Sequence, residues 1–119
     1  MLTSYALQHP AAKNFDFRRI RFAMAGAAPL SAELTMQMVK KMPNASIGQG
    51  YGMTETCTTV SMTPVSQHIG VFGSAGHLMP GCVGRVLKPD GTLAGVGEEG
   101  ELMVKGPSNA LRYYNNDQA

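Results

Sequence analysis

The chain of 119 residues lacks tryptophan and has only two cysteines, few charged residues (15%) and no long apolar run. No stretch approaches the roughly 20 apolar residues that a membrane-spanning helix needs, so no transmembrane segment is expected. Residues 1–10 contain neither a basic leader nor an apolar core, so no signal peptide is predicted. Cys57 and Cys82 show no Cys-x-x-Cys spacing, and we expect free thiols in a reducing compartment.

Positive and negative charges nearly balance, and the net charge is +2 at pH 7. The densest basic cluster is Arg18, Arg19 and Arg21. Such a cluster could touch phosphate, but a solvated turn is the preferred interpretation, and nothing here resembles a nucleic-acid footprint. The histidines are dispersed and match no metal-ligand spacing.

What is present is a strand–helix–strand pattern between residues 20 and 52. Apolar residues alternate with others over 20–24, which indicates a strand, and the small residues 26–29 then predict a tight turn. A second strand begins at Ile47 and runs into the glycine-rich segment 48–52, also predicted as a turn. The pattern is typical of a βαβ unit with a parallel strand pair, in which ligands gather at the carboxyl ends of the strands.

The helix between these strands is predicted from its cap and its periodicity. Ser31 is a good N-cap, and Leu34, Met38 and Met42 recur at every fourth position on one face. Pro43 ends the helix. The methionines of this region are predicted to fill the core: Met36, Met38 and Met42.

The remaining segments predict few helices. Residues 3–8 are expected to be the end of a helix that is broken before Pro10. Residues 64–81 carry several glycines and predict a long loop, which in a compact domain is usually functional. Beyond it, strands are expected at 83–88 and 101–105, with a turn at 89–91.

The chemistry-bearing segment is Gly48-Gln49-Gly50-Tyr51-Gly52-Met53-Thr54-Glu55. Its glycines let backbone and a flat ring approach a ligand closely. The hydroxyl of Thr54 suits a phosphate oxygen, and Glu55 suits Mg²⁺, which takes one or two carboxylates plus phosphate oxygens. Composition alone favours a plain glycine-rich turn with a solvated Glu55. A dinucleotide fingerprint is a weaker alternative, because its third glycine is misplaced.

The run Gly50-Tyr51-Gly52-Met53-Thr54-Glu55 resembles the Y-G-x-T-E motif of the AMP-forming adenylate-forming (acyl-CoA synthetase) superfamily. Three further stretches resemble family motifs in the family's order: Gly26-Ala27-Ala28-Pro29-Leu30, Gly73-Ser74-Ala75-Gly76, and Gly100-Glu101-Leu102 followed by Gly106 and Tyr113. The likeness covers nearly the whole chain and is greatest to 4-coumarate–CoA ligase-like enzymes. It implies an α/β fold, namely a fragment of the large N-terminal domain with one βαβ unit followed by a β-rich segment.

The resemblance also implies a reaction. The family activates a carboxylic acid, aryl or fatty, with ATP and Mg²⁺ to an acyl-adenylate, and then transfers the acyl group to coenzyme A. Thr54 and Glu55 would be catalytic, with Thr54 holding the α-phosphate and Glu55 binding Mg²⁺. The implied adenylate contacts are Ala27, Gln49, Gly50, Tyr51, Gly52 and Thr54. The implied acyl-slot residues are Gly48, Gly50 and Met62.

Compared with the family pattern, residues 1–119 form a partial AMP-binding domain. The phosphate loop is expected upstream of residue 1, and the hinge and C-terminal lid with the catalytic lysine downstream of Ala119. We therefore expect this chain alone to make no acyl-adenylate and to be marginally stable or to aggregate. A non-catalytic nucleotide-binding or interaction module derived from such a domain is the alternative. The expected compartment is cytoplasmic or peroxisomal.

Overall fold

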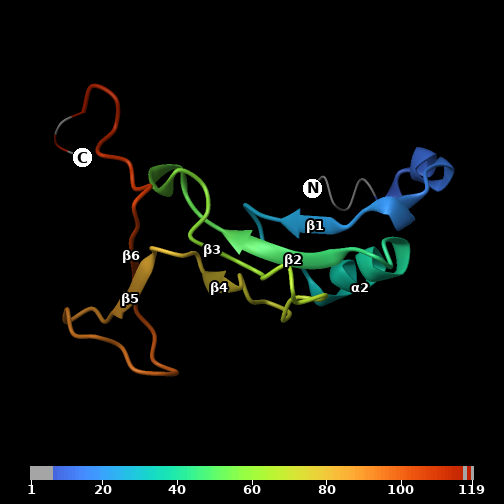
Figure 1. The fold of residues 1–119 in the computed structure, drawn as a ribbon. Helices are drawn as coiled ribbons and strands as arrows, with labels where there is room; N and C mark the ends of the chain where they lie inside the picture. Colours follow the sequence, from blue (N-terminus) through green and yellow to red (C-terminus); the bar gives the residue numbers. More distant parts are fainter. Residues whose placement is uncertain (1–6, 117, 119) are drawn as a thin grey trace. The chain divides into compact units, whose positions relative to one another are not determined.

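The computed structural model describes residues 7–116 and 118. The chain divides into two compact units, Met1–Tyr51 with Ser61–His77, and Gly52–Val60 with Leu78–Ala119. The elements, in order, are η1 (Pro10–Asn14), η2 (Phe17–Arg19), β1 (Phe22–Ala25), α2 (Ala32–Lys41), β2 (Ser46–Tyr51), η3 (Thr54–Thr56), β3 (Ser61–Met62), β4 (His77–Leu78), β5 (Val83–Leu87) and β6 (Glu101–Lys105) (Figure 1). Of the helix predicted at 3–8, residues 3–6 lie outside the described part, and Leu7 and Gln8 are helical.

The first unit is built on β2. Strand β1 pairs with it in parallel, from Phe22 opposite Ser46 to Ala25 opposite Gln49, and β3 pairs with its far end antiparallel. With α2 as the crossover, this confirms the predicted βαβ unit (Figure 1). The turn predicted at 48–52 is wrong for residues 48–51, which belong to β2. Hydrogen bonding of β2 to strands on both sides outweighs the tendency of its glycines to form turns.

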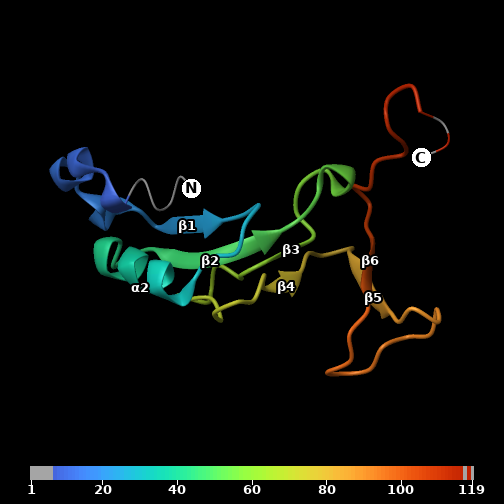
Figure 2. The same ribbon diagram turned by 180° about the vertical axis from the view of Figure 1, so that it is seen from behind.

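Helix α2 begins where the sequence predicts. The Ser31 hydroxyl accepts a hydrogen bond from the backbone N–H of Leu34 at 3.2 Å, which is an N-cap interaction. The helix packs on one face of the parallel pair (Figures 1 and 2). The buried core side chains are Leu30, Met38, Met42, Ala45 and Ile47. The prediction that Met36 fills the core is wrong, since it is 45% exposed. Two positions before Met38, it points to the opposite side of the helix.

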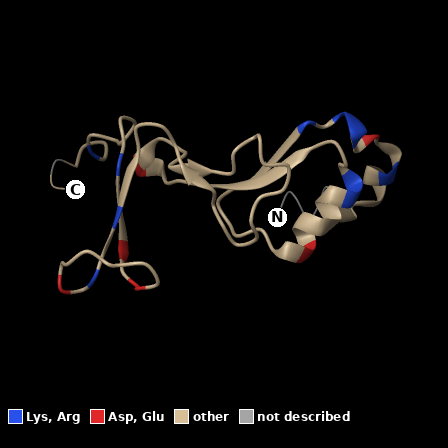
Figure 3. Cartoon of the chain, turned by 60° about the horizontal axis from the view of Figure 1, so that its bottom comes forward, with Lys and Arg blue, Asp and Glu red and all other residues tan. Residues whose placement is uncertain are grey.

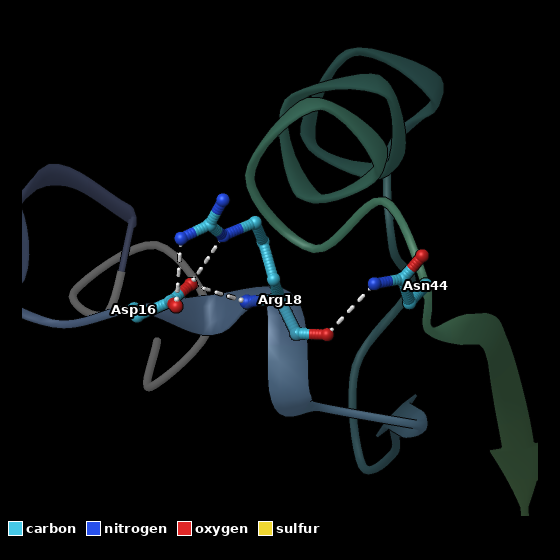
Figure 4. A network of polar contacts seen from close by, with 3 residues as sticks. All are labelled: Asp16, Arg18 and Asn44. Carbon is cyan, nitrogen blue, oxygen red and sulfur yellow. Dashed lines mark hydrogen bonds and ion pairs between the residues drawn. The ribbon is translucent and has the colours of Figure 1, made fainter.

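The basic cluster belongs to an ordered turn before β1. Asp16 caps η2 by accepting from the backbone N–H of Arg18 at 3.0 Å and also receives the Arg18 guanidinium, while the Asn44 side chain donates to the Arg18 carbonyl (Figure 4). The hydrogen bonds from Arg18 hold the pKa of Asp16 below its ordinary value. In this unit the basic positions gather over the 3-10 helices and the end of α2 (Figure 3). The preferred interpretation as an exposed turn fits this arrangement.

The second unit contains a two-stranded antiparallel sheet. Strand β5 pairs with β6 in continuous register, from Val83 opposite Lys105 to Leu87 opposite Glu101, which confirms the two predicted strands. A turn with Gly91 in the left-handed region (φ 80°) follows β5. In the connection between β5 and β6, the Lys88 ammonium lies 2.9 Å from the Glu98 carboxylate and forms an ion pair with it. Across residues 7–116 and 118, no helix has both the length and the apolar character to cross a membrane.

Candidate functional site

The predicted site residues are distributed over the two units. The first unit contains Ala27, Gly48, Gln49, Gly50, Tyr51 and Met62, and the second contains Gly52, Thr54 and Glu55. Each group forms its own local arrangement, and all of these residues except Ala27 and Met62 belong to one continuous segment of sequence, residues 48–55.

In the first unit, the turn after β1 lies beside the carboxyl end of β2. A methyl group placed on Gly26 would lie 3.7 Å from the carbonyl oxygen of Gly50, so the two backbones run close together. Ala27 has a φ of 63°, in the left-handed region that residues other than glycine rarely adopt. Such backbone strain is concentrated at functional sites. The turn after β1 and the end of β2 are thus brought together at Gly26 and Gly50, as the βαβ pattern predicts.

Gln49 connects this turn to a third segment. Its side-chain oxygen accepts a hydrogen bond from the backbone N–H of Leu30 at 2.6 Å, and its amide nitrogen donates to the carbonyl oxygen of Ser74 at 3.4 Å. The backbone of Gln49 is held in turn by Thr63, whose N–H donates to the Gln49 carbonyl at 2.8 Å. One side chain therefore links the turn 26–30, strand β2 and the segment 73–76, which are three of the four motifs.

Packing against neighbouring side chains explains why glycine occupies two positions of β2. A methyl group on Gly48 would lie 2.3 Å from Cβ of Thr63, and one on Gly50 would lie 3.2 Å from Sδ of Met24. Met62 pairs with Gly50 across the β2–β3 ladder. Tyr51, at the end of β2, keeps 38% of its surface exposed. The assignment of Gly48, Gly50 and Met62 to an acyl slot stays a prediction.

In the second unit, Thr54 and Glu55 stand on a tightly closed loop, residues 52–58. A methyl group on Gly52 would lie 1.3 Å from the carbonyl oxygen of Thr58, so only glycine fits there. Thr58 itself has a φ of 106°, a rare conformation for a β-branched residue. Thr56 is buried and its hydroxyl bonds both the N–H and the carbonyl of Met53. Thr54 and Glu55 are exposed on this loop.

The sequence analysis did not predict the contact between Glu55 and Tyr113. The Tyr113 hydroxyl donates a hydrogen bond to the Glu55 carboxylate across 58 positions of sequence. This bond lowers the pKa of Glu55 and raises the pKa of Tyr113, because it stabilises the carboxylate and the protonated phenol together. No local spacing could reveal the contact. The one sequence feature that includes Tyr113 is its place at the end of the fourth family motif.

A pocket of about 310 Å³ opens beside this pair. It is lined by Thr54, Glu55, Ala110, Leu111, Arg112, Tyr113 and Tyr114. A hydroxyl, a carboxylate and apolar surface thus share one hollow. Among the described residues, 7–116 and 118, no cluster of three acidic, histidine or cysteine side chains could hold a metal by itself. A Mg²⁺ ion that takes one carboxylate and completes its shell with phosphate oxygens and water is compatible with a single Glu55.

Comparisons with known proteins match nearly the whole chain. The family model described as AMP-binding enzyme covers residues 1–114. Acyl-CoA synthetase 7 of Caenorhabditis elegans is 37% identical over 113 residues, which are 94% of this chain and 20% of that protein. Probable 4-coumarate–CoA ligase 1 of Dictyostelium discoideum is 37% identical over 112 residues, 92% of this chain and 20% of that protein. The chain thus spans about a fifth of the length of these curated relatives.

A solved structure supports the same relationship. The N-terminal domain of FACL13 from Mycobacterium tuberculosis superposes with a TM-score of 0.78 at 26% identity, over 97% of this chain and 29% of that one. The match confirms the predicted fold class, an α/β part of a large N-terminal domain in which one βαβ unit is followed by a β-rich segment.

Proposed function

Because the chain belongs to the AMP-binding enzyme family, whose model matches residues 1–114, we propose that it is part of an acid–CoA ligase. Such an enzyme activates a carboxylic acid with ATP to an acyl-adenylate and transfers the acyl group to coenzyme A. The observation that carries the proposal is the exposure of Thr54 and Glu55 together on one closed loop beside the pocket of the second unit.

The loop gives each of these side chains a distinct task. The Thr54 hydroxyl donates a hydrogen bond to the α-phosphate of ATP, where negative charge accumulates as the acid attacks. Glu55 supplies a carboxylate as the ligand for Mg²⁺. The close approach of Gly52 to Thr58 closes the backbone of the loop, so little ordering of the backbone is left for the moment when the nucleotide binds.

The carboxylate of Glu55 is a hard oxygen donor of the kind that Mg²⁺ prefers. When bound, Mg²⁺ supplies charge neutralisation on the phosphates. The task of Glu55 is to remain ionised, which the Tyr113 hydrogen bond favours by lowering its pKa.

The first unit contributes the remaining predicted contacts. Gln49, Gly50 and Tyr51 border the adenylate, with the exposed ring of Tyr51 packing on adenine, and Ala27 lies beside the acyl-adenylate. Gly52, which belongs to the second unit, is also assigned to nucleotide binding. The acyl slot is assigned to Gly48, Gly50 and Met62. The acid is aryl or fatty, and the proposed compartment is the cytoplasm or the peroxisome.

The proposal is tested by ATP–pyrophosphate exchange in the full-length protein, with a panel of aryl and fatty acids. Exchange is expected with at least one acid. Removal of one charge-stabilising group, by Glu55→Gln or Thr54→Ala, is expected to lower the exchange rate by about 100- to 1,000-fold. Glu99→Gln is the matched control, because Glu99 is exposed in the β5–β6 connection and stands outside the proposed site. Binding of ATP–Mg²⁺ without exchange for any acid would instead favour a non-catalytic nucleotide-binding module.

A further inference from the structure

The hydrogen bond from Tyr113 to Glu55 is one of several contacts between their two segments. Two further hydrogen bonds join segment 108–113 to loop 52–58: the Ala110 N–H donates to the Glu55 carbonyl at 2.6 Å, and the Ser108 hydroxyl donates to the Thr56 carbonyl at 2.9 Å. The backbone of Glu55 and its side chain are therefore both held by the same distant segment. A neutral phenol is a poor ligand for Mg²⁺ compared with a carboxylate, so the chemistry of Tyr113 is to donate a hydrogen bond.

We propose that Tyr113 is a positioning residue of the adenylation site, whose hydroxyl fixes one oxygen of the Glu55 carboxylate and thereby orients the other toward the metal-bound nucleotide. This inference rests on the proposed function. Outer partners of this kind orient ligating carboxylates at many metal sites, and their loss weakens metal binding. Tyr113 acts through Glu55 and touches neither the reacting carboxyl group nor the phosphorus.

Electrostatics supports the same role. The Tyr113 hydrogen bond is the largest cause of the lowered pKa of Glu55. The other titratable groups lining the pocket are Arg112 and Tyr114. Tyr113→Phe removes the hydroxyl and keeps the ring, so it isolates the hydrogen bond from the packing.

The first measurement does not depend on activity. The pKa of Glu55 is read from the carboxyl ¹³C shift in the wild-type protein, in Tyr113→Phe and in Ser108→Ala. The pKa is expected to rise in Tyr113→Phe. It is expected to stay unchanged in Ser108→Ala, which loosens the same segment without touching the carboxylate. An unchanged pKa in Tyr113→Phe would overturn the proposal, as would an equal rise in Ser108→Ala.

The second measurement is the Mg²⁺ dependence of ATP–pyrophosphate exchange. In Tyr113→Phe, the Mg²⁺ concentration for half-maximal rate is expected to rise about threefold to tenfold, as for loss of an exposed hydrogen bond to a charged group. Tyr113→Phe is expected to have no further effect in a Glu55→Ala background, because that substitution removes the acceptor of its hydrogen bond. An unaltered Mg²⁺ dependence, or an equal effect in both backgrounds, would refute the positioning role. Absence of exchange in the wild type would count against the proposed function instead, and the carboxyl titration would still decide the contact.

Discussion

The side-chain oxygen of Gln49 accepts the backbone N–H of Leu30 at 2.6 Å, joining the end of β2 to the turn that follows β1. Leu30 is buried, so its N–H is shielded from water and depends on this partner. Gln49→Ala leaves that donor unsatisfied, and we expect it to lower the free energy of unfolding by about 1–3 kcal/mol. Chemical denaturation of the two proteins measures the difference.

A matched control for this substitution lies on α2. Gln37 makes a surface hydrogen bond of 3.3 Å to Glu33, one turn earlier on the helix. Gln37→Ala is expected to change stability by less than about 0.5 kcal/mol. Equal effects at positions 37 and 49 would mean that the link to Leu30 contributes nothing to stability.

Gly48 provides a second test, because strand β2 is packed there against a neighbouring side chain. A methyl group at position 48 would lie 2.3 Å from Cβ of Thr63 and 2.8 Å from its methyl carbon, closer than atoms can pack. We expect Gly48→Ala to destabilise the first unit by about 1–3 kcal/mol, the usual cost of overpacking. In Gly84→Ala, the nearest atom is 3.6 Å away, so a thermal melt is expected to show little change or a gain. A neutral Gly48→Ala would contradict the observed packing.

Local rules were enough to predict much of the first unit. The Ser31 cap and the spacing of Met38 and Met42 predicted α2, because a helix is governed by contacts within one or two turns. The glycines of β2 misled the analysis, since their strand conformation depends on pairing with β1 and β3. Strand pairing depends on residues that are far apart in the sequence, so the local composition of a segment cannot predict it.

The candidate site shows the same division. Thr54 and Glu55 were predicted from a short motif, and the structure finds them together on one loop. Tyr113 was not assigned a role, because its partner is 58 positions away and no period or cap connects them. The resemblance to the family supplied the order of the motifs, but the contacts between motifs, such as Gln49 with Ser74, required the fold.

Ala27 offers a test of backbone strain in the turn. Its φ of 63° costs a residue with a side chain about 1–2 kcal/mol relative to glycine. Glycine in turn loses about 0.5–1 kcal/mol through its greater freedom in the unfolded chain. We therefore expect Ala27→Gly to be neutral or stabilising by up to about 1.5 kcal/mol. Ala23→Gly, in the extended backbone of β1, is the control and should destabilise. If both substitutions destabilised equally in denaturant titrations, Ala27 would not be strained.

The Tyr113–Glu55 bond predicts a defined pH window for stability. The pKa of Glu55 is lowered from 4.5, so its contribution is present above that value and is lost as pH falls through the folded-state pKa. The pKa of Tyr113 is raised from 10.0, so its contribution is present below that value and is lost as pH rises through the folded-state pKa. The bond therefore stabilises the second unit between these limits and fades on both sides.

Melting temperatures of the wild type and Tyr113→Phe, measured from acid to alkaline pH, test this window. The wild type should melt higher near neutral pH, and the two curves should converge at both extremes, where either the carboxylate is protonated or the phenol is ionised. Tyr114→Phe is the control, because it removes a hydroxyl from the next side chain, which is 94% exposed. A difference between wild type and Tyr113→Phe that stayed constant across the range would contradict a stabilising hydrogen bond between the Tyr113 hydroxyl and the ionised Glu55 carboxylate.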